Sequence, residues 1–206
     1  MEVTLIRHGP TQWNATRRFQ GRTDLPLSGE GRRQARAIAV ALESETFDRI
    51  YSSDLTRAFE TATILAASRG LGVTRDARLR EFDFGHWEGM TWNEIVAAYP
   101  HLAGRGSTAA TLYAPEGGET FEEVCERVRS FFDDIWRDGA VQSAAVVTHA
   151  GPLHAVLSVL HLQERNEAGD ALSLRFTPGG ITRLRADGGR ATVLTLNDVR
   201  HLDAAN

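Results

Sequence analysis

The most constraining feature of this sequence is the alternation of short, mainly apolar segments with longer segments of helical period. Residues 3–6, 49–52 and 144–148 are brief and rich in apolar side chains, which predicts strands buried within a sheet. Apolar residues at helical spacing follow the first two segments, over 28–42 and 55–66. Strands that alternate with helices predict an α/β fold, a three-layer α/β/α sandwich with a mostly parallel central sheet.

The second half of the chain carries further local signals. Thr120-x-x-Glu123 is a capping-box pattern that predicts a helix with one buried face. Residues 173–176 and 181–184 predict a hairpin, and 192–196 predict a further strand. No internal repeat or linker interrupts the chain, so we expect a single domain over residues 1–206.

Residues 99–119 are rich in glycine and small polar side chains and have no period, which predicts a long loop. Its part over 99–115 carries Tyr99, Leu102, Leu112 and Tyr113. These side chains favour either a lid over a partly apolar leaving group or a loop that packs down on the core.

Basic residues show an unusual composition, because all 23 are arginine and lysine is absent. Mechanisms that need a lysine, such as Schiff-base formation or a P-loop, are therefore excluded. Seven arginines and two acids fall within residues 7–36, a local charge of +5 in a chain whose net charge is −4. Nucleic-acid-binding proteins are usually basic overall, so this segment favours a small anionic ligand over nucleic acid; a solvated basic surface is the alternative.

Metal and membrane sites find little support in the sequence. The single cysteine, Cys125, excludes an internal disulfide and a thiolate-clustered zinc site, and its place in a helical pattern predicts a core residue. No H-x-H or H-E-x-x-H spacing occurs, so we expect no metal and no cofactor. The longest apolar stretch, 144–160, is shorter than the roughly 20 residues that cross a membrane. Residues 1–7 do not resemble a secretory signal, so we expect a cytoplasmic monomer or homodimer.

Phosphate-binding residue types follow each predicted parallel strand. Arg7-His8-Gly9 follows the first strand, a segment ending in Arg57 follows the second, and Thr148-His149 ends the strand at 144–148. Because the carboxyl ends of parallel strands meet at one edge of a sheet, these residues are expected to converge there. Helix N-termini at the same edge add N–H donors that favour an anion.

Several longer runs carry a resemblance to a known family: RHGPTQWN (7–14), RFQGRTDLPLSGEGRRQA (18–35), YSSDLTRAFETA (51–62), LREFDFGHWEGMTWNEI (79–95), THAG (148–151) and NDVRHL (197–202). Together they resemble the histidine phosphatase superfamily, which has the phosphoglycerate-mutase-like fold. The resemblance covers nearly the whole chain. It is strongest to the short phosphatase branch that contains α-ribazole phosphatase and the broad-specificity acid phosphatases.

This resemblance implies a metal-independent phosphomonoesterase with a phosphohistidine intermediate on His8. Arg7 and Arg57 would hold the phosphoryl oxygens and keep His8 neutral, and His149 would be a further donor. Glu81 would be the general acid, although an ion pair with Arg78 or Arg80 is the alternative for this carboxylate. The further phosphate contacts implied by the resemblance are Asn14, Gln20 and Gly21.

Other histidines and other functions are weighed against this interpretation. His86, His101, His154, His161 and His201 are expected to be surface or core residues, and His154 stands where the family often has arginine. A mutase-type phosphotransferase is the main alternative, but the family's mutases use lysine and paired arginines in an insert where this chain has only Arg105. A non-catalytic phospho-ligand binding protein is the third possibility, although all five implied site residues are present. The expected partner is a small-molecule phosphomonoester.

Overall fold

The computed structural model describes residues 1–104, 115–160, 175–187 and 190–203. Its six strands form one mixed sheet in the order β3-β2-β4-β1-β5-β6. The strands are β1 (Glu2–Arg7), β2 (Arg49–Ser52), β3 (Val73–Arg75), β4 (Ser143–Thr148), β5 (Ile181–Asp187) and β6 (Arg190–Asp198). The first four are mutually parallel, whereas β5 runs antiparallel to β1 and β6 runs antiparallel to β5.

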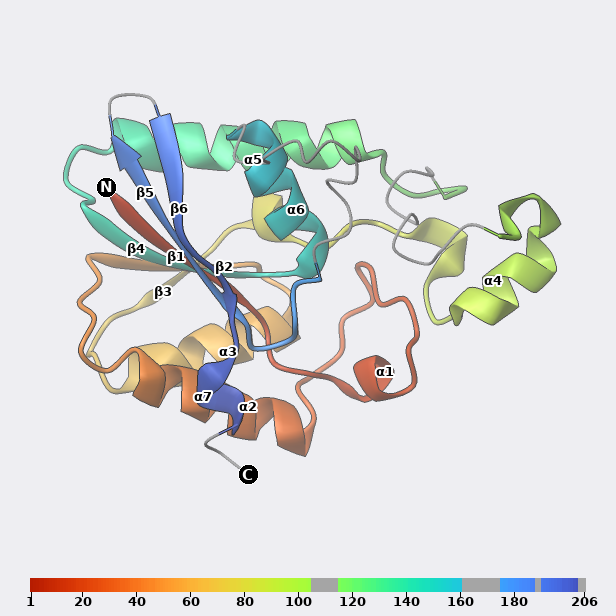
Figure 1. Cartoon of the computed structure of the whole chain (residues 1–206), viewed down its shortest axis with the longest axis horizontal. Coiled ribbons are helices and arrows are strands. Elements are labelled where there is room, and N and C mark those ends of the chain that lie inside the picture. Colours follow the sequence, from red (N-terminus) through yellow and green to blue (C-terminus); the bar gives the residue numbers. More distant parts are fainter. Residues whose placement is uncertain (105–114, 161–174, 188–189, 204–206) are drawn as a thin grey trace.

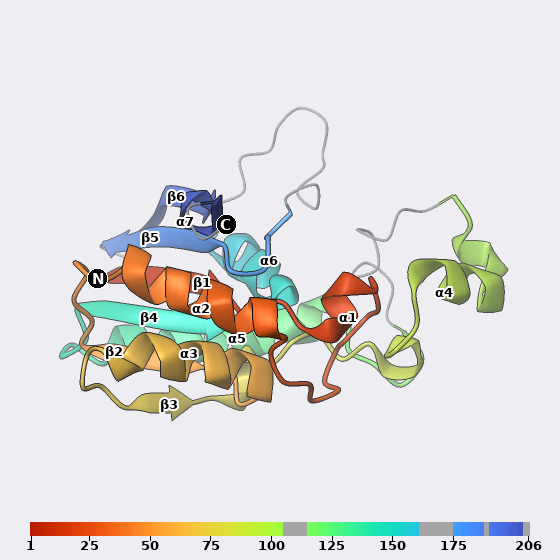
Figure 2. The ribbon, with the colours of Figure 1, turned by 90° about the horizontal axis from the view of Figure 1, so that it is seen from below.

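Helices cover both faces of this sheet, with α5 and α6 on one face and α2, α3 and α7 on the other (Figures 1 and 2). The helices of the described residues are α1 (Gln12–Ala15), α2 (Gly29–Ala41), α3 (Thr56–Ala67), α4 (Trp92–Ala98), α5 (Phe121–Arg137), α6 (Ala150–Val159) and α7 (Arg200–Asp203). Three short 3-10 turns, Ala77–Leu79, Gly85–Trp87 and Pro100–Leu102, connect them. The predicted three-layer α/β/α sandwich is confirmed. None of the described helices is both long and apolar enough to cross a membrane.

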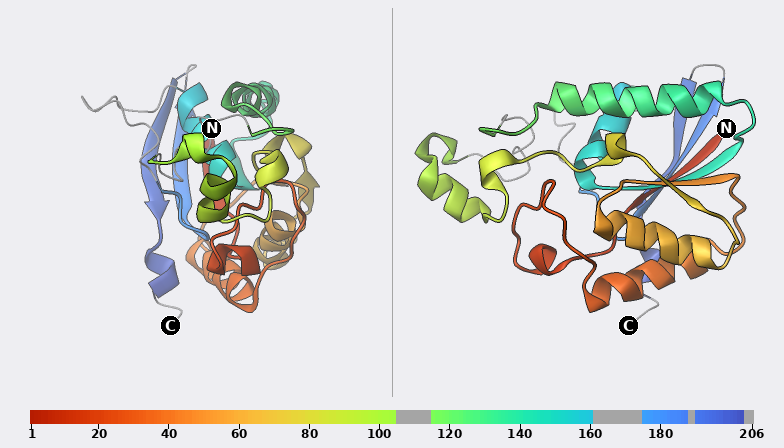
Figure 3. Two further views of the ribbon diagram at one scale, coloured as in Figure 1. Left: turned by 90° about the vertical axis from the view of Figure 1, so that its right-hand side faces the viewer. Right: turned by 180° about the vertical axis from the view of Figure 1, so that it is seen from behind.

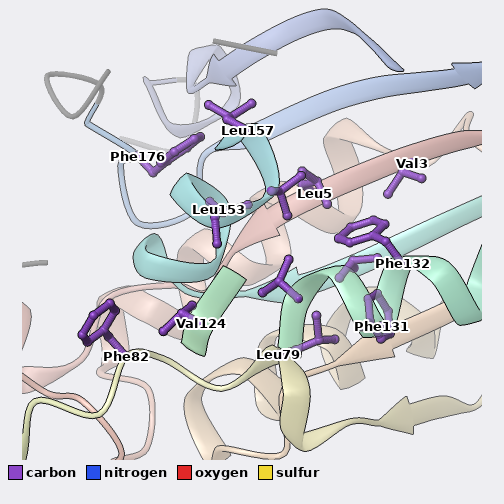
Figure 4. Packing of buried hydrophobic residues seen from close by; sticks show 14 of the residues in the cluster. Val3, Leu5, Leu79, Phe82, Val124, Phe131, Phe132, Leu153, Leu157 and Phe176 are labelled. Carbon is purple, nitrogen blue, oxygen red and sulfur yellow. The ribbon is translucent and has the colours of Figure 1, made fainter. Parts of the chain in front are cut away.

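Alternate side chains of the central strands pack on opposite faces and so build two cores. Leu5 and Val146 join the cluster beneath α5 and α6, whereas Ile6 and Val147 join the cluster beneath α2 and α3. Figure 4 shows the first cluster, in which Leu5 lies among side chains of α5 and α6. Burial of each aliphatic or phenyl side chain contributes about 1.5–3 kcal/mol to the stability of the fold. The two cores therefore hold the sheet firmly between its two layers of helices.

Helix starts follow the predicted pattern at two helices and depart from it at a third. Ser28 caps α2 by accepting from the Gly31 amide, and Thr120 with Glu123 forms the capping box of α5. At α3 the N-cap residue is Leu55, which makes no side-chain capping bond, and the preceding Asp54 pairs with Arg80. The first amide of α3, that of Thr56, donates to Asp24 at 2.7 Å, so a distant loop caps this helix.

The predicted hairpin between 173–176 and 181–184 is wrong. Strand β5 pairs with β1 and β6, and residues 175–177 are not in a strand, while 173 and 174 lie outside the described residues. The reason is a tertiary contact, because the Gly179 amide donates to the carbonyl of Arg7 at 3.1 Å and the Arg7 amide donates to that of Gly180. These bonds direct the chain along β1 instead of letting it turn back on itself.

The predictions for Cys125 as a core residue and for the loop over 99–115 are each met in part. Cys125 is half-buried at the margin of the larger core cluster. In the predicted loop, Leu102 is buried and Tyr99 contacts Trp87 with ring centroids 6.1 Å apart, so these two side chains pack down on the core. Leu112 and Tyr113 lie outside the described residues, and the lid interpretation remains a prediction.

Candidate active site

The carboxyl ends of the parallel strands open toward the side of the molecule that carries α1 and α4 (Figures 1 and 3). Arg7 pairs with Thr148 across β1 and β4, so His8 and His149 continue side by side from adjacent strands. Their rings meet edge to face with centroids 4.9 Å apart. A cavity of about 820 Å³ lies at this edge, and its lining includes Arg7, His8, Arg57 and Glu81.

The His8 ring is oriented by its own backbone. Its Nδ1 lies 2.6 Å from the carbonyl oxygen of Gly9. Because a carbonyl can only accept, Nδ1 carries the proton and Nε2 keeps its lone pair. Nε2 has no hydrogen-bond partner among the described residues, and His8 is only 1% exposed. The ring is therefore fixed and buried, with a single open nitrogen.

Both site histidines are kept neutral by their surroundings. Burial is the main cause that holds the pKa of His8 well below its usual range, and the charges of Arg57 and Arg7 lower it further. Burial likewise lowers the pKa of His149, followed by the charges of Arg57, His8 and Arg7. Neither ring nitrogen of the buried His149 has a partner in the described part of the chain, so the hydrogen-bonding capacity of both is unused there.

Arg57 is a fully buried cation held by backbone carbonyls. Its guanidinium donates to the oxygen of Gly21 at 2.6 Å and to that of Thr23 at 2.9 Å. No carboxylate of the described residues pairs with it, and Nε has no partner there. A buried charge without an ion pair is costly unless a ligand compensates it. This arrangement favours an anion beside Arg57.

Arg7 is held in a similar way at the end of β1. One of its terminal nitrogens donates to the carbonyl of Phe176, and its Nε has no partner among the described residues. Burial lowers the pKa of Arg7 and Arg57, and the charge of Glu81 opposes this effect at both. Two permanently charged guanidinium groups thus border the open nitrogen of His8.

Glu81 lies against the start of α6 and is not an ion-pair partner of Arg78 or Arg80. Its Oε1 accepts from the amides of Gly151 and Phe82, each at 2.9 Å, whereas Oε2 has no partner among the described residues. A Cβ on Gly151 would lie 2.5 Å from Oε1, so the close approach requires glycine there. The ion-pair alternative for Glu81 is therefore wrong, since Arg78 pairs with Asp76 and Arg80 with Asp54.

The backbone around Glu81 is held in place by hydrogen bonds from Arg127. Arg127 of α5 donates to the carbonyls of Arg78 and Arg80 at 2.7 Å and to that of Glu81 at 3.2 Å. Its partner Glu119 accepts from the Asp83 amide at 3.0 Å. These contacts join α5 to the segment 78–83 and fix the position of the carboxylate.

The loop that holds Arg57 is fastened by Glu88. This carboxylate accepts from the Arg22 amide at 2.7 Å, from the Thr23 amide at 2.9 Å and from the Thr23 hydroxyl at 2.6 Å. The backbone before them turns through Gly21 at φ 53°, a conformation that suits glycine. A Cβ on Gly21 would also collide with the Glu88 carboxylate. Glu88 therefore orients the two carbonyls that bind Arg57.

Asn14, Gln20 and Gly21, implied as phosphate contacts, all line the cavity. The side-chain oxygens of Asn14 and Gln20 accept from the Thr11 hydroxyl at 3.2 and 3.0 Å. Their amide nitrogens make no hydrogen bond within the described ranges and remain available as donors. Gly21 differs from them, because its carbonyl already accepts from Arg57.

The cavity wall also includes residues that sequence reasoning did not assign to the site. His154, expected to be a surface or core residue, lines the cavity with its ring against that of Phe176, the centroids 5.0 Å apart. Burial and the charge of Arg7 lower the pKa of His154 to about 4. The available signal was its place in the helix that directly follows His149. Arg17 and Arg175 also line the cavity; Arg17 lies in the basic segment 7–36, whereas no sequence pattern singled out Arg175.

No three His, Cys, Asp or Glu side chains among the described residues gather as a metal site. The arrangement can bind a tetrahedral anion between Arg7, Arg57 and His149. It presents the open nitrogen of His8 and a carboxylate to that anion. These are the elements of a phosphoryl-transfer site.

Comparisons with known proteins agree with this geometry. Phosphoglycerate mutase-like protein 4 of Arabidopsis thaliana is 35% identical over 205 residues, which span 98% of this chain and 87% of the relative. Phosphoserine phosphatase 1 of Hydrogenobacter thermophilus is 34% identical over 160 residues, 78% of this chain and 76% of the relative. The structure of mycobacterial glucosyl-3-phosphoglycerate phosphatase in complex with VO3 superposes with a TM-score of 0.86 at 30% identity, covering 96% of this chain and 99% of that chain.

The sequence profile of the histidine phosphatase superfamily (branch 1) matches residues 3–199. That range contains every residue placed at the cavity above, from Arg7 to Arg175. The chain belongs to the histidine phosphatase superfamily.

Proposed function

We propose that this protein is a metal-independent phosphomonoesterase that hydrolyses a small-molecule phosphate ester through a phosphohistidine on His8. The observation that carries the proposal is the buried, neutral His8 ring, whose open Nε2 lies beside arginines that have no carboxylate partner. Relatives named as phosphatases support a phosphatase activity for the chain. The finer assignment, a histidine acid phosphatase type of enzyme working as one domain, belongs to the proposal.

The first half of the reaction transfers the phosphoryl group to the enzyme. Arg7, Arg57 and His149 bind the phosphoryl oxygens and stabilise the charge that they carry in the transition state. The lone pair of His8 Nε2 attacks phosphorus while the P–O bond to the leaving alcohol breaks. Glu81 in its acid form gives its proton to the departing oxygen, which leaves as a neutral alcohol.

The second half returns the enzyme to its starting state. Water attacks the phosphohistidine, and the Glu81 carboxylate, formed in the first step, takes up the proton that the water loses. The P–N bond breaks, its electron pair returns to Nε2, and inorganic phosphate departs. Gly9 holds the Nδ1 proton throughout, so the same nitrogen is ready for the next substrate.

The competing activity is transfer of the phosphoryl group to a second alcohol instead of water, as in a mutase. Products distinguish the two outcomes. A phosphatase releases inorganic phosphate and alcohol in equal amounts, whereas a mutase returns a phosphate ester isomer and little free phosphate. Phosphorus NMR of the complete reaction measures this ratio directly.

The test of the mechanism is capture of the intermediate. Nitrophenyl phosphate labelled at phosphorus is mixed with enzyme and the reaction is stopped in alkali, where a phosphohistidine survives. We expect label on the wild-type protein and none on His8→Ala. The matched control is His86→Ala, because His86 is exposed and is not among the cavity-lining residues. Wild-type turnover by His8→Ala overturns the mechanism.

A further inference from the structure

The cavity continues well beyond the place where a phosphoryl group would bind. Its volume of about 820 Å³ falls in the range of cavities that enclose whole small molecules. His8, Arg57 and Glu81 surround only one part of it. The remaining wall must therefore face the leaving group, and its side chains determine which alcohol fits.

That remaining wall is strongly basic. In addition to Arg7 and Arg57, the cavity is lined by Arg17, Arg18 and Arg175, whereas Glu81 is the single carboxylate among the described residues that line it. Arg18 is already engaged, because it donates to the Gly89 carbonyl at 2.6 Å and pairs with Glu94 at 2.9 Å. The other two arginines differ from it.

Arg17 and Arg175 are exposed and carry unused donors. Neither side chain makes a hydrogen bond or an ion pair with any described residue, whereas eleven arginines of the described residues pair with a carboxylate. Two cations that share a cavity without anionic partners favour an anionic ligand. Neither arginine belongs to the group of residues, Arg7, Arg57 and His149, that binds the reacting phosphoryl group in the proposed mechanism.

The backbone at both arginines is fixed by hydrogen bonds, so each side chain starts from a defined position at the cavity. Arg17 has φ 55°, a left-handed conformation that is unusual for a residue other than glycine or asparagine, and its amide donates to Asn14. The carbonyl of Arg175 accepts from the Asn197 side chain at 2.9 Å. The following carbonyl, that of Phe176, accepts from Arg7. Arg175 is thus one residue from a direct contact with the phosphate-binding arginine.

We propose that Arg17 and Arg175 form a subsite for a second anionic group, a carboxylate or a second phosphate, on the leaving alcohol of the substrate. This inference rests on the proposed phosphatase function. The planar guanidinium fork matches both kinds of anion, and the exposure of both arginines to water keeps each contribution moderate. Preferred substrates are therefore small phosphomonoesters with at least two anionic groups.

The experiment compares three substrates that differ at one carbon. Glycerol 3-phosphate has an uncharged hydroxymethyl group where 3-phosphoglycerate has a carboxylate and glycerol 1,3-bisphosphate has a second phosphate. We expect the wild-type enzyme to show a higher kcat/KM on the charged substrates. Arg17→Gln and Arg175→Gln should each lower the charged-to-uncharged ratio about fivefold, mainly through KM. The ratio should also fall at high ionic strength.

The control and the outcomes separate this inference from the proposed function. Arg129→Gln removes the same charge from an exposed position on α5 that is not among the cavity-lining residues, and it should leave the ratio unchanged. A preference for only one charged substrate identifies which anion the subsite takes. Equal kcat/KM on all three substrates, or an equal loss on all three in the arginine variants, overturns the subsite. Failure of the phosphatase function has a different signature, because the wild-type enzyme then forms no phosphohistidine from nitrophenyl phosphate.

Discussion

Glu88 makes no contact with a substrate in the proposed mechanism, yet its removal should impair the reaction. The carboxylate accepts three hydrogen bonds from Arg22 and Thr23, and the carbonyls of that loop bind Arg57. Glu88→Ala removes all three bonds at once. The loop then loses the contact that orients its carbonyls, and the buried guanidinium loses its fixed position.

The size of the effect can be bounded from the contacts. A hydrogen bond to a charged acceptor contributes about 1.5–3 kcal/mol, and water replaces part of this because Glu88 is only half-buried. Loss of the phosphate-binding cation itself sets the upper limit, about 10²–10³ in kcat for the removal of one such donor. We therefore expect Glu88→Ala to lower kcat/KM on nitrophenyl phosphate by about 10- to 100-fold, mainly through kcat. Glu88→Gln, which keeps one acceptor oxygen, should recover part of this loss.

A double-mutant cycle tests whether Glu88 acts through Arg57. If it does, Glu88→Ala should cost less than about twofold in an Arg57→Ala background, because the group that it positions is already absent. Thermal unfolding measured alongside separates positioning from a general loss of structure. The same 10- to 100-fold loss in both backgrounds would refute the reasoning.

Three further predictions concern Glu81 and the buried histidines. Glu81→Gln should slow hydrolysis of alkyl phosphates far more than that of nitrophenyl phosphate, because a nitrophenolate leaves without a proton; equal losses in kcat/KM contradict the general-acid role. Gly151→Ala places a Cβ 2.5 Å from Glu81 Oε1 and should reproduce the same selective loss, whereas Gly139→Ala, which meets nothing within 4 Å, should not. His8, His149 and His154 are neutral in the folded protein but take up protons in the unfolded chain below about pH 6.5. The free energy of unfolding should therefore decline as the pH falls below that value, by about 1.4 kcal/mol per pH unit for each histidine. For His154 the decline ends near pH 4; urea titrations across this range should show a shallower slope for His154→Gln, and an unchanged slope would contradict the assignment.

The sequence predicted the sheet edge and the residues at its strand ends because those depend on local patterns. Buried strands are visible in the sequence as apolar runs. A residue at the carboxyl end of a parallel strand must lie at one known edge of the sheet. Arg7 ends β1, whereas His8 and His149 directly follow β1 and β4, and the structure brings the three together. Glu81 needed the family resemblance, since no local pattern separates it from an ion-pair partner of the neighbouring arginines.

Residues that act through distant contacts were beyond local reasoning. In the sequence, Glu88 is one of the acids near Glu81 that could share its role, and Arg127 is an ordinary charge on a helix. Only tertiary packing shows that Glu88 holds the Arg57 loop and that Arg127 holds the Glu81 segment. The hairpin prediction failed for a related reason. Residues 178–180 have turn composition, but their backbone bonds to the end of β1, and this tertiary contact decided the pairing of β5.

The pairing of β1 with β4 has a consequence for the order of folding. Arg7 and His8 lie near the start of the chain, and Thr148 and His149 lie far along it, yet the register of these two strands places them next to each other. Closing a loop of that length is slow and entropically costly, and no local contact can substitute for it. A nascent or partly refolded chain in which β1 is still unpaired from β4 contains every residue of the cavity but no place for a phosphate. Recovery of activity during refolding therefore measures the formation of the β1–β4 strand pair.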